Sequence, residues 1–154
     1  MSAIAHLRQE LPGECFAEYC QRDGCSVSLA GAPSRHVVVD MDSDSLGISN
    51  DTRCDYLFVS EADGLTCVVP IEMKQGSLKA ARVVVQLQAG ADFANQHLPN
   101  LPGFKFVPIL AHQGLPKAER NRLRERSRAV KFRKQKALAK TIRCGAPIAA
   151  QLPA

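Results

Sequence analysis

The spacing of apolar residues predicts a set of short strands. Four runs rich in β-branched and aromatic residues have strand-like lengths: 35–42 (RHVVVDMD), 54–60 (CDYLFVS), 66–74 (TCVVPIEMK) and 104–111 (FKFVPILA). Asp63-Gly64 lies between the second and third runs and is a common turn dipeptide, so these runs predict a β-hairpin. Pro70 lies inside the third run and cannot donate a ladder hydrogen bond, which predicts an edge strand or a bulge there.

After Gly76 the apolar period changes from two to about 3.6, which is typical of a helix. One apolar stripe predicts a helix over 77–98; its members are Val84, Leu87, Ala91, Ala94 and Leu98. Ser77 is placed to cap the first turn, and the following sequence, PNLPG, ends the helix.

Both ends of the chain carry further predicted elements. Residues 2–22 contain a helix candidate that Pro12-Gly13 interrupts, with ECFAEYC (14–20) as its preferred part. Near the C-terminus, KAERNRLRER favours a helix, whereas AVKFR and LAKTIRCG look extended and KQK can form a turn. We therefore expect a loop or short helix followed by a basic hairpin. The order helix, three strands, helix, strand and basic extension predicts one α/β domain over 1–154, with a mixed sheet of the α+β type.

Composition narrows the class of protein. A chain of 154 residues that is 45% hydrophobic and 23% charged suits one soluble globular domain. Its apolar runs fall short of the roughly 20 residues that span a bilayer, and the N-terminus lacks the order of a secretory signal. We therefore expect a cytoplasmic protein without a membrane partner. Disulfides are not expected, and the cysteines are interpreted as small buried residues; the alternative is a metal or iron–sulfur site made by Cys15, Cys20, Cys25 and Cys144.

The positive charge is concentrated near the C-terminus. The net charge is +5, and the segment 117–143 contains only two acidic residues, Glu119 and Glu125. Clustered cations favour a polyanion through counterion release, so we expect this segment to contact nucleic acid, although a solvated basic face has the same composition. The residues expected to make these contacts are Lys117, Arg120, Arg122, Arg124, Lys131, Arg133 and Lys134.

Three charged residues interrupt the predicted hairpin. Glu72 and Lys74 fall on one face of their strand, and a turn centred near Asp63 places Asp55 opposite residue 70 or 71, within one residue of Glu72. Two carboxylates at such a distance repel each other unless a cation lies between them. Oxygen ligands with a lysine nearby favour Mg²⁺ over zinc. The alternative is an ordinary exposed Glu–Lys pair at the end of an edge strand.

This arrangement resembles the PD-(D/E)xK nuclease superfamily. Asp55, followed by Glu72-Met73-Lys74 after a strand, a turn and a strand, matches the motif, although Arg53-Cys54 rather than proline precedes the aspartate. The resemblance covers roughly residues 14–110, and it implies a restriction-endonuclease-like core of helix, three strands, helix and strand.

The resemblance also implies a chemistry, the hydrolysis of phosphodiester bonds, with DNA as the expected substrate. Asp55 and Glu72, with the carbonyl of Met73, would hold Mg²⁺ or Mn²⁺, and Lys74 would position water and stabilise charge on the phosphate. Gln86 matches a glutamine of some branches, although the helical projection also places Gln88 beside the apolar stripe.

The resemblance further implies an acidic residue on the first helix. Glu14 and Glu18 are the candidates, with Glu18 preferred because ECFAEYC is the better helical stretch.

Other functions fit parts of the sequence. A catalytically silent nucleic-acid-binding module would keep the fold and the basic surface, and an RNA-binding component of a ribonucleoprotein would use the basic segment. A homodimer would allow both strands of a duplex to be cut. The acidic stretch DMDSDSLGISND partly matches a calcium loop, but it is interpreted as a solvated loop; its acids are Asp40, Asp42, Asp44 and Asp51.

Overall fold

The computed structural model describes residues 2–48 and 52–153. The α-helices are α1 (Ala3–Glu10), α2 (Ala80–His97) and α3 (Lys117–Leu123). The main sheet contains β1 (Phe16–Ala17), β4 (His36–Asp40), β5 (Tyr56–Ala62), β6 (Leu65–Lys74), β7 (Phe104–Phe106), β8 (Ile109–His112) and β11 (Lys140–Arg143). Two small hairpins lie outside it: β2 (Cys20–Arg22) with β3 (Cys25–Val27), and β9 (Val130–Phe132) with β10 (Gln135–Ala137). Short 3-10 helices span Gly13–Cys15, Asp44–Leu46, Arg126–Arg128 and Ile148–Gln151.

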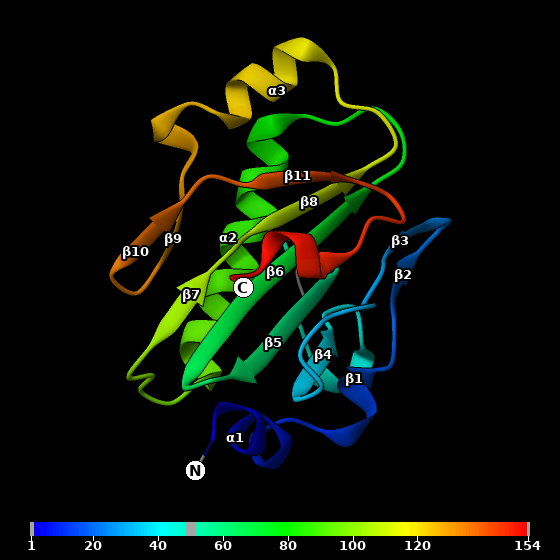
Figure 1. Cartoon of the computed structure of the whole chain (residues 1–154). Helices are drawn as coiled ribbons and strands as arrows, with labels where there is room; N and C mark the ends of the chain where they lie inside the picture. Colours follow the sequence, from blue (N-terminus) through cyan, green and yellow to red (C-terminus); the bar gives the residue numbers. More distant parts are fainter. Residues whose placement is uncertain (1, 49–51, 154) are drawn as a thin grey trace.

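The main sheet is mixed, as the sequence predicted. Its strands run in the order β1, β4, β5, β6, β8, β11, and β7 also pairs with β6. Pairing is antiparallel from β1 to β6 and parallel among β6, β7, β8 and β11. The helix α2 connects β6 to the parallel strands and lies behind the sheet in Figure 1.

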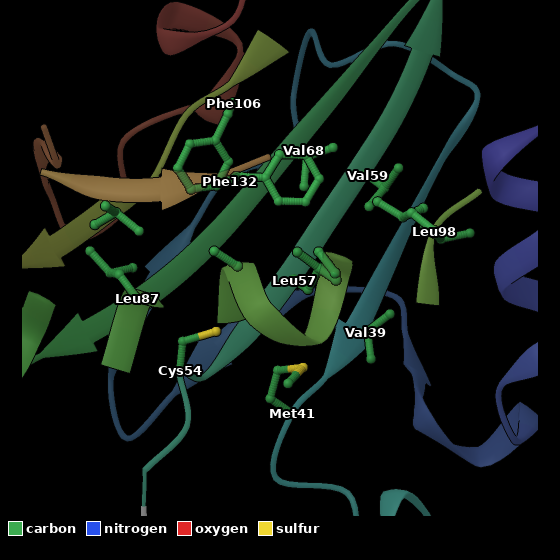
Figure 2. Close-up of a cluster of buried hydrophobic side chains, with 14 of the residues drawn as sticks. Val39, Met41, Cys54, Leu57, Val59, Val68, Leu87, Leu98, Phe106 and Phe132 are labelled. Atoms are coloured by element: carbon green, nitrogen blue, oxygen red, sulfur yellow. The ribbon is translucent and has the colours of Figure 1, made fainter. Parts of the chain in front are cut away.

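The main hydrophobic core lies between α2 and the sheet. Figure 2 shows side chains from β4, β5, β6, α2 and β9 meeting there, with Phe106 and Phe132 stacked at 5.2 Å. A Cβ atom at Gly90 would lie 2.5 Å from Cys54 Sγ and 2.9 Å from Pro70 Cβ, so the absence of a side chain lets α2 approach the hairpin closely. A second apolar cluster fills the opposite face of the sheet, under β3 and the C-terminal residues.

The start of α2 differs from the prediction. The helix begins at Ala80, and the predicted cap, Ser77, lies outside it. The N–H of Ala80 donates instead to Glu119 Oε1 at 2.9 Å, so a residue of α3 satisfies the first turn of α2. A cap supplied from 39 residues away leaves no local pattern in the sequence.

The prediction that Pro70 marks an edge strand or a bulge is wrong. β6 is the central strand, with β5 on one side and β7 and β8 on the other. The β6–β7 ladder ends at Val68, and the β6–β8 ladder begins at Ile71. Pro70 falls in this interruption, so its missing N–H is accommodated within a central strand. The predicted run 104–111 is correspondingly split into β7 and β8.

The first helix lies earlier than predicted. Residues 3–10 form α1, while the preferred stretch, 14–20, contains a 3-10 turn and the short strand β1. Ser2 caps α1 by accepting a hydrogen bond from Ala5 N, and the N–H of Ile4 donates to Glu61 Oε1 at 2.8 Å, which fastens the helix to β5.

The basic segment forms the predicted short helix and hairpin, but with different strands. The turn falls at Arg133 and Lys134 between β9 and β10, whereas the stretch 138–144 leaves the hairpin and contributes β11 to the main sheet. α3 and β9 both pack against α2, so this segment belongs to the same folded body as the core.

The cysteines also depart from expectation. Cys25 and Cys144 form a disulfide bond that joins β3 to the end of β11, so the expectation of reduced cysteines is wrong for this pair. A shared metal site with Cys15 and Cys20 is thereby excluded, because two of its ligands are already bonded to each other. The remaining cysteines, Cys15, Cys20, Cys54 and Cys67, are free and buried. Among the described residues, none of the helices is long and apolar enough to cross a bilayer.

Candidate functional site

The β5–β6 hairpin brings Asp55 and Glu72 together. The ladder ends where Tyr56 pairs with Ile71, and Asp55 lies directly beyond that pair, close enough to Glu72 for its charge to act on it. Asp55 Oδ2 accepts a hydrogen bond from the N–H of Met73 at 2.7 Å, and the N–H of Asp55 donates to the carbonyl of Ile71 at 3.0 Å. The aspartate is therefore held by backbone on both sides.

Glu72 is paired with Lys74 and almost fully enclosed. Lys74 Nζ lies 3.0 Å from Glu72 Oε2, and the glutamate side chain is 3% exposed against 25% for the lysine. An ordinary surface pair on an edge strand is thus ruled out, because the strand is central and the carboxylate is buried. The two side chains share the α2-facing side of β6 with Val68.

Burial and the neighbouring Asp55 oppose the ionisation of Glu72. Burial raises the pKa of Glu72 to about 8, and the neighbouring charge of Asp55 adds to the effect. Burial also raises the pKa of Asp55, although the Met73 N–H and Arg22 oppose it. Glu72 Oε1 has no hydrogen-bond partner within the described structure. A proton or a bound cation would relieve both the repulsion and the unsatisfied oxygen.

Arg22 belongs to this site, and no pattern in the sequence indicated it. Its Nη2 donates to Asp40 Oδ1 at 2.8 Å and to the carbonyl of Asp55 at 3.3 Å, and its Nε lies 3.5 Å from Asp55 Oδ1. The guanidinium also lies over the ring of Tyr56, 4.8 Å from its centroid. Arg22 therefore fixes the aspartate from the β2–β3 hairpin, 33 residues earlier in the chain.

The acidic loop after β4 is partly engaged by the same arginine. Asp42 Oδ2 lies 3.4 Å from Arg22 Nη2, and Asp42 Oδ1 lies 2.6 Å from Arg53 Nε. Asp44 starts a 3-10 helix, and Asp51 lies outside the described residues. Asp40 and Asp42 are thus partners of arginine.

The structure separates the two candidate glutamines. Gln88 binds the backbone of Lys131 in both directions, at 2.8 and 2.9 Å, and so attaches α2 to β9. Gln86 is buried and faces the sheet one helical turn before Gly90, which contacts Pro70. One turn of helix covers about the same distance as two residues of strand, so Gln86 lies at the level of Glu72. Gln86 Oε1 is buried without a partner in the described part of the chain.

Glu18 and Glu14 are not brought to this site. Both are exposed, and Glu18 follows β1 in a surface turn beside Tyr19 and His36. The helix on which the choice of Glu18 depended does not form at 14–20. The acid that α1 does carry near its end, Glu10, binds His97 at 2.6 Å instead.

The predicted nucleic-acid-binding residues form two groups. Around α3, Arg120 acts electrostatically on His112, and Arg122 pairs with Glu119. Around the β9–β10 hairpin, Arg133 donates to Asn95 Oδ1 and to the carbonyls of Leu98 and Pro99 at 2.7–3.0 Å. Arg133 thus ties the hairpin to the end of α2. The other members, Lys117, Arg124, Lys131 and Lys134, are exposed.

The donor set of the site suits a hard divalent cation. Asp55 and Glu72 offer carboxylate oxygens, Glu72 Oε1 has no partner among the described residues, and Met73, whose carbonyl is the third candidate oxygen, directly follows Glu72. The described residues contain no cluster of three or more His, Cys, Asp or Glu side chains able to hold a metal. A metal here would therefore rely on two carboxylates, backbone and water, an arrangement that Mg²⁺ accepts.

Comparison of the chain with protein-family models, with curated proteins and with solved structures finds no match. What the geometry defines is a class of site: a buried carboxylate, a half-buried carboxylate beside it and a lysine at the end of a central strand. Such a group can hold a divalent cation and place a positive charge beside a water or a phosphate.

Proposed function

We propose that this protein is a metal-dependent nuclease of the PD-(D/E)xK superfamily that hydrolyses phosphodiester bonds in DNA. The observation that carries the proposal is buried Glu72 beside half-buried Asp55, with Lys74 Nζ 3.0 Å from Glu72 Oε2. Burying a carboxylate next to a second one costs several kcal/mol, roughly, unless a cation compensates them. A structural role alone gives no reason for such an arrangement on a central strand.

The order of elements supports the same proposal. A helix, three antiparallel strands, a helix and a strand parallel to the third follow one another as α1, β4, β5, β6, α2 and β8. This order, with β1–β3 and β7 inserted into it, supports the core that the resemblance implies, with its first helix at residues 3–10.

The proposed cofactor is Mg²⁺ or Mn²⁺, held by Asp55, Glu72 and the carbonyl of Met73. When bound, it would supply a Lewis acid that polarises the phosphate and lowers the pKa of a water. Arg22 and the Met73 N–H hold the Asp55 carboxylate in place for this role. The raised pKa of Glu72 makes proton release a condition of metal binding.

Lys74 would supply the positive charge of the proposed active site. Its ammonium group stands beside Glu72 and is partly exposed, so it can reach a water or a phosphate oxygen next to the carboxylates. There it would orient the water and stabilise the negative charge that develops on the phosphate. Gln86 faces the same region from α2 and can accept a hydrogen bond from that water.

The basic segment supports a polyanionic substrate, and among the seven residues proposed to bind it Arg120 acts electrostatically on His112, which pairs with Lys74. We propose a cytoplasmic enzyme, in keeping with the sequence, and a homodimer if both strands of a duplex are cut.

The deciding experiment is cleavage of plasmid and linear DNA with Mg²⁺, with Mn²⁺ and with EDTA. We expect metal-dependent cutting that falls by about 10²–10⁴-fold in Lys74→Ala and Asp55→Ala. Lys105→Ala, which removes an exposed lysine from β7, serves as the matched control and should retain activity. Binding without cutting would favour a catalytically silent module. Undiminished cutting by both site variants would place the active site elsewhere.

A further inference from the structure

A row of basic side chains leads away from the carboxylates. In the parallel ladders, Lys74 pairs with His112, and His112 pairs with Arg143. Side chains alternate along a strand, and Leu110 belongs to the α2-facing core, so His112 points to the same face as Lys74. Arg143 shares this face, because its neighbour Ile142 belongs to the opposite cluster.

His112 lines a polar cleft. The residue is 4% exposed, and its Nδ1 is buried without a hydrogen-bond partner among the described residues. It lines a cleft of about 370 Å³ at the carboxyl ends of β8 and β11, together with Gly24, Ser26, Gln113, Arg143, Cys144 and Gly145. The cleft adjoins the candidate site, because the N–H of Gln113 donates to the carbonyl of Lys74 at 3.3 Å.

The charges around the cleft favour an anion. Arg143 donates from Nη1 to the carbonyl of Gln113 at 2.9 Å, which holds the exposed guanidinium across the end of β8. The structure gives its remaining N–H groups no acceptor among the described residues. Burial and the positive charges of Arg143 and Arg120 lower the pKa of His112, and the same positive potential stabilises a bound anion.

We propose that this cleft binds a phosphate group of the nucleic-acid strand, with the exposed Arg143 guanidinium supplying charge and hydrogen-bond donors and His112 forming part of the cleft wall. The proposal rests on the proposed function and assigns a substrate contact next to its active site. Neighbouring strands are about 4.8 Å apart, which puts Arg143 about 10 Å from Lys74. The bound phosphate is therefore a neighbour of the one that is cut, and its position sets the direction of the strand across the site.

The phosphate could be a terminal monoester or an internal diester. Both present oxygens that a guanidinium binds in a bidentate manner. A monoester carries more charge and marks the end of a strand, so the two sources predict different responses to removal of a 5′-phosphate.

The test measures affinity for fluorescent single-stranded and duplex oligonucleotides in EDTA, each with a 5′-phosphate or a 5′-hydroxyl. We expect Arg143→Gln to weaken binding about tenfold and to reduce the salt slope by about one. His112→Gln should weaken it several-fold. Lys140→Gln is the matched control, because Lys140 is exposed on the same strand and faces the other side of the sheet.

The possible results distinguish the two kinds of phosphate from each other and the phosphate cleft from the nuclease activity. A loss in Arg143→Gln that requires the 5′-phosphate identifies a terminal monoester, and an equal loss on both oligonucleotides identifies an internal diester. Equal losses in Arg143→Gln and Lys140→Gln overturn the proposal. Arg143 is at the surface, so its variant should fold even where His112→Gln does not. Cleavage by Lys74→Ala tests the nuclease independently: a selective Arg143 effect without any cleavage would keep the phosphate cleft and reject the nuclease.

Discussion

The two halves of α2 differ in whether their buried polar side chains have hydrogen-bond partners. At its C-terminal end, Arg133 satisfies two backbone carbonyls and Asn95, and His97 binds Glu10. In its N-terminal half, Glu119 satisfies the Ala80 N–H, but Gln86 faces the sheet with an Oε1 that has no partner among the described residues, near Glu72 Oε1, which has none either. The C-terminal contacts join hairpin and helix, whereas the atoms at Gln86 and Glu72 remain unsatisfied.

This contrast separates charges that hold the fold from those that we assign to function. In the described part of the chain, every buried side-chain nitrogen or oxygen without a partner belongs to Arg22, Glu72, Gln86 or His112. Each such atom costs about 1–3 kcal/mol when nothing binds it. Folded proteins contain few of them, so their concentration at the end of β6 and its neighbours indicates a binding site.

The largest expected effect on stability comes from removing the contacts of Arg133 at the C-terminal end of α2. Arg133→Ala should lower the free energy of unfolding by about 2–3 kcal/mol, because three acceptors lose a charged donor at once. Urea unfolding measures the change. Lys134→Ala, in the same turn, is the control and should change stability by less than about 0.5 kcal/mol. Equal stability in the two variants would contradict the structural role.

At Glu72, whose Oε1 has no partner among the described residues, we expect a substitution to raise stability instead. Glu72→Gln should abolish cleavage yet raise stability at pH 8 without metal by about 1–2 kcal/mol, because it removes a buried carboxylate that faces Asp55. Thermal unfolding of both proteins in EDTA provides the measurement. A destabilised variant would mean that the ion pair with Lys74 outweighs the repulsion from Asp55.

The same glutamate predicts a pH dependence for the wild type. Its folded pKa of about 8 exceeds the ordinary value of 4.5, so the folded state binds more protons than the unfolded chain between these values. This contribution to stability is fully present below pH 4.5 and is lost as the pH rises through 8. Mg²⁺ should therefore stabilise the wild type more at pH 8 than at pH 6, and should not stabilise Glu72→Gln.

A smaller effect sharpens the comparison between the two glutamines. Gln86→Leu should change stability by less than about 1 kcal/mol, because its buried oxygen has no partner to lose, while cleavage falls about tenfold. Gln88→Leu should instead cost about 1–2 kcal/mol through its two bonds to Lys131, with cleavage retained. Paired unfolding and cleavage assays distinguish the two, and a reversed pattern would exchange their roles.

The smallest expected effect concerns DNA affinity. Arg120→Gln should weaken binding by about 0.5–1 kcal/mol, since Arg120 lies next to His112 and the proposed phosphate cleft. Lys134→Gln, at the distant hairpin, should weaken binding less. Titration at two salt concentrations tests the difference, and a larger loss at Lys134 would move the DNA path towards the hairpin.

Much of the architecture follows from local pattern. Apolar periodicity and the Asp63-Gly64 turn predicted β4, β5, β6 and α2 closely, because side-chain alternation and turn chemistry are properties of neighbouring residues. The same turn predicted Asp55 beside residue 70 or 71, and its N–H donates to the carbonyl of Ile71, since a hairpin's register depends on its own loop.

Only the tertiary structure decided the surroundings of that pair. Arg22 reaches Asp55 from another hairpin, Glu119 caps α2 from α3, and Cys25 meets Cys144 across a separation of 119 residues. The sequence by itself determined the hairpin that carries the proposed site. The order of strands and the packing of α2 determined which distant groups satisfy it and which remain unpaired, because such contacts depend on how elements meet in space.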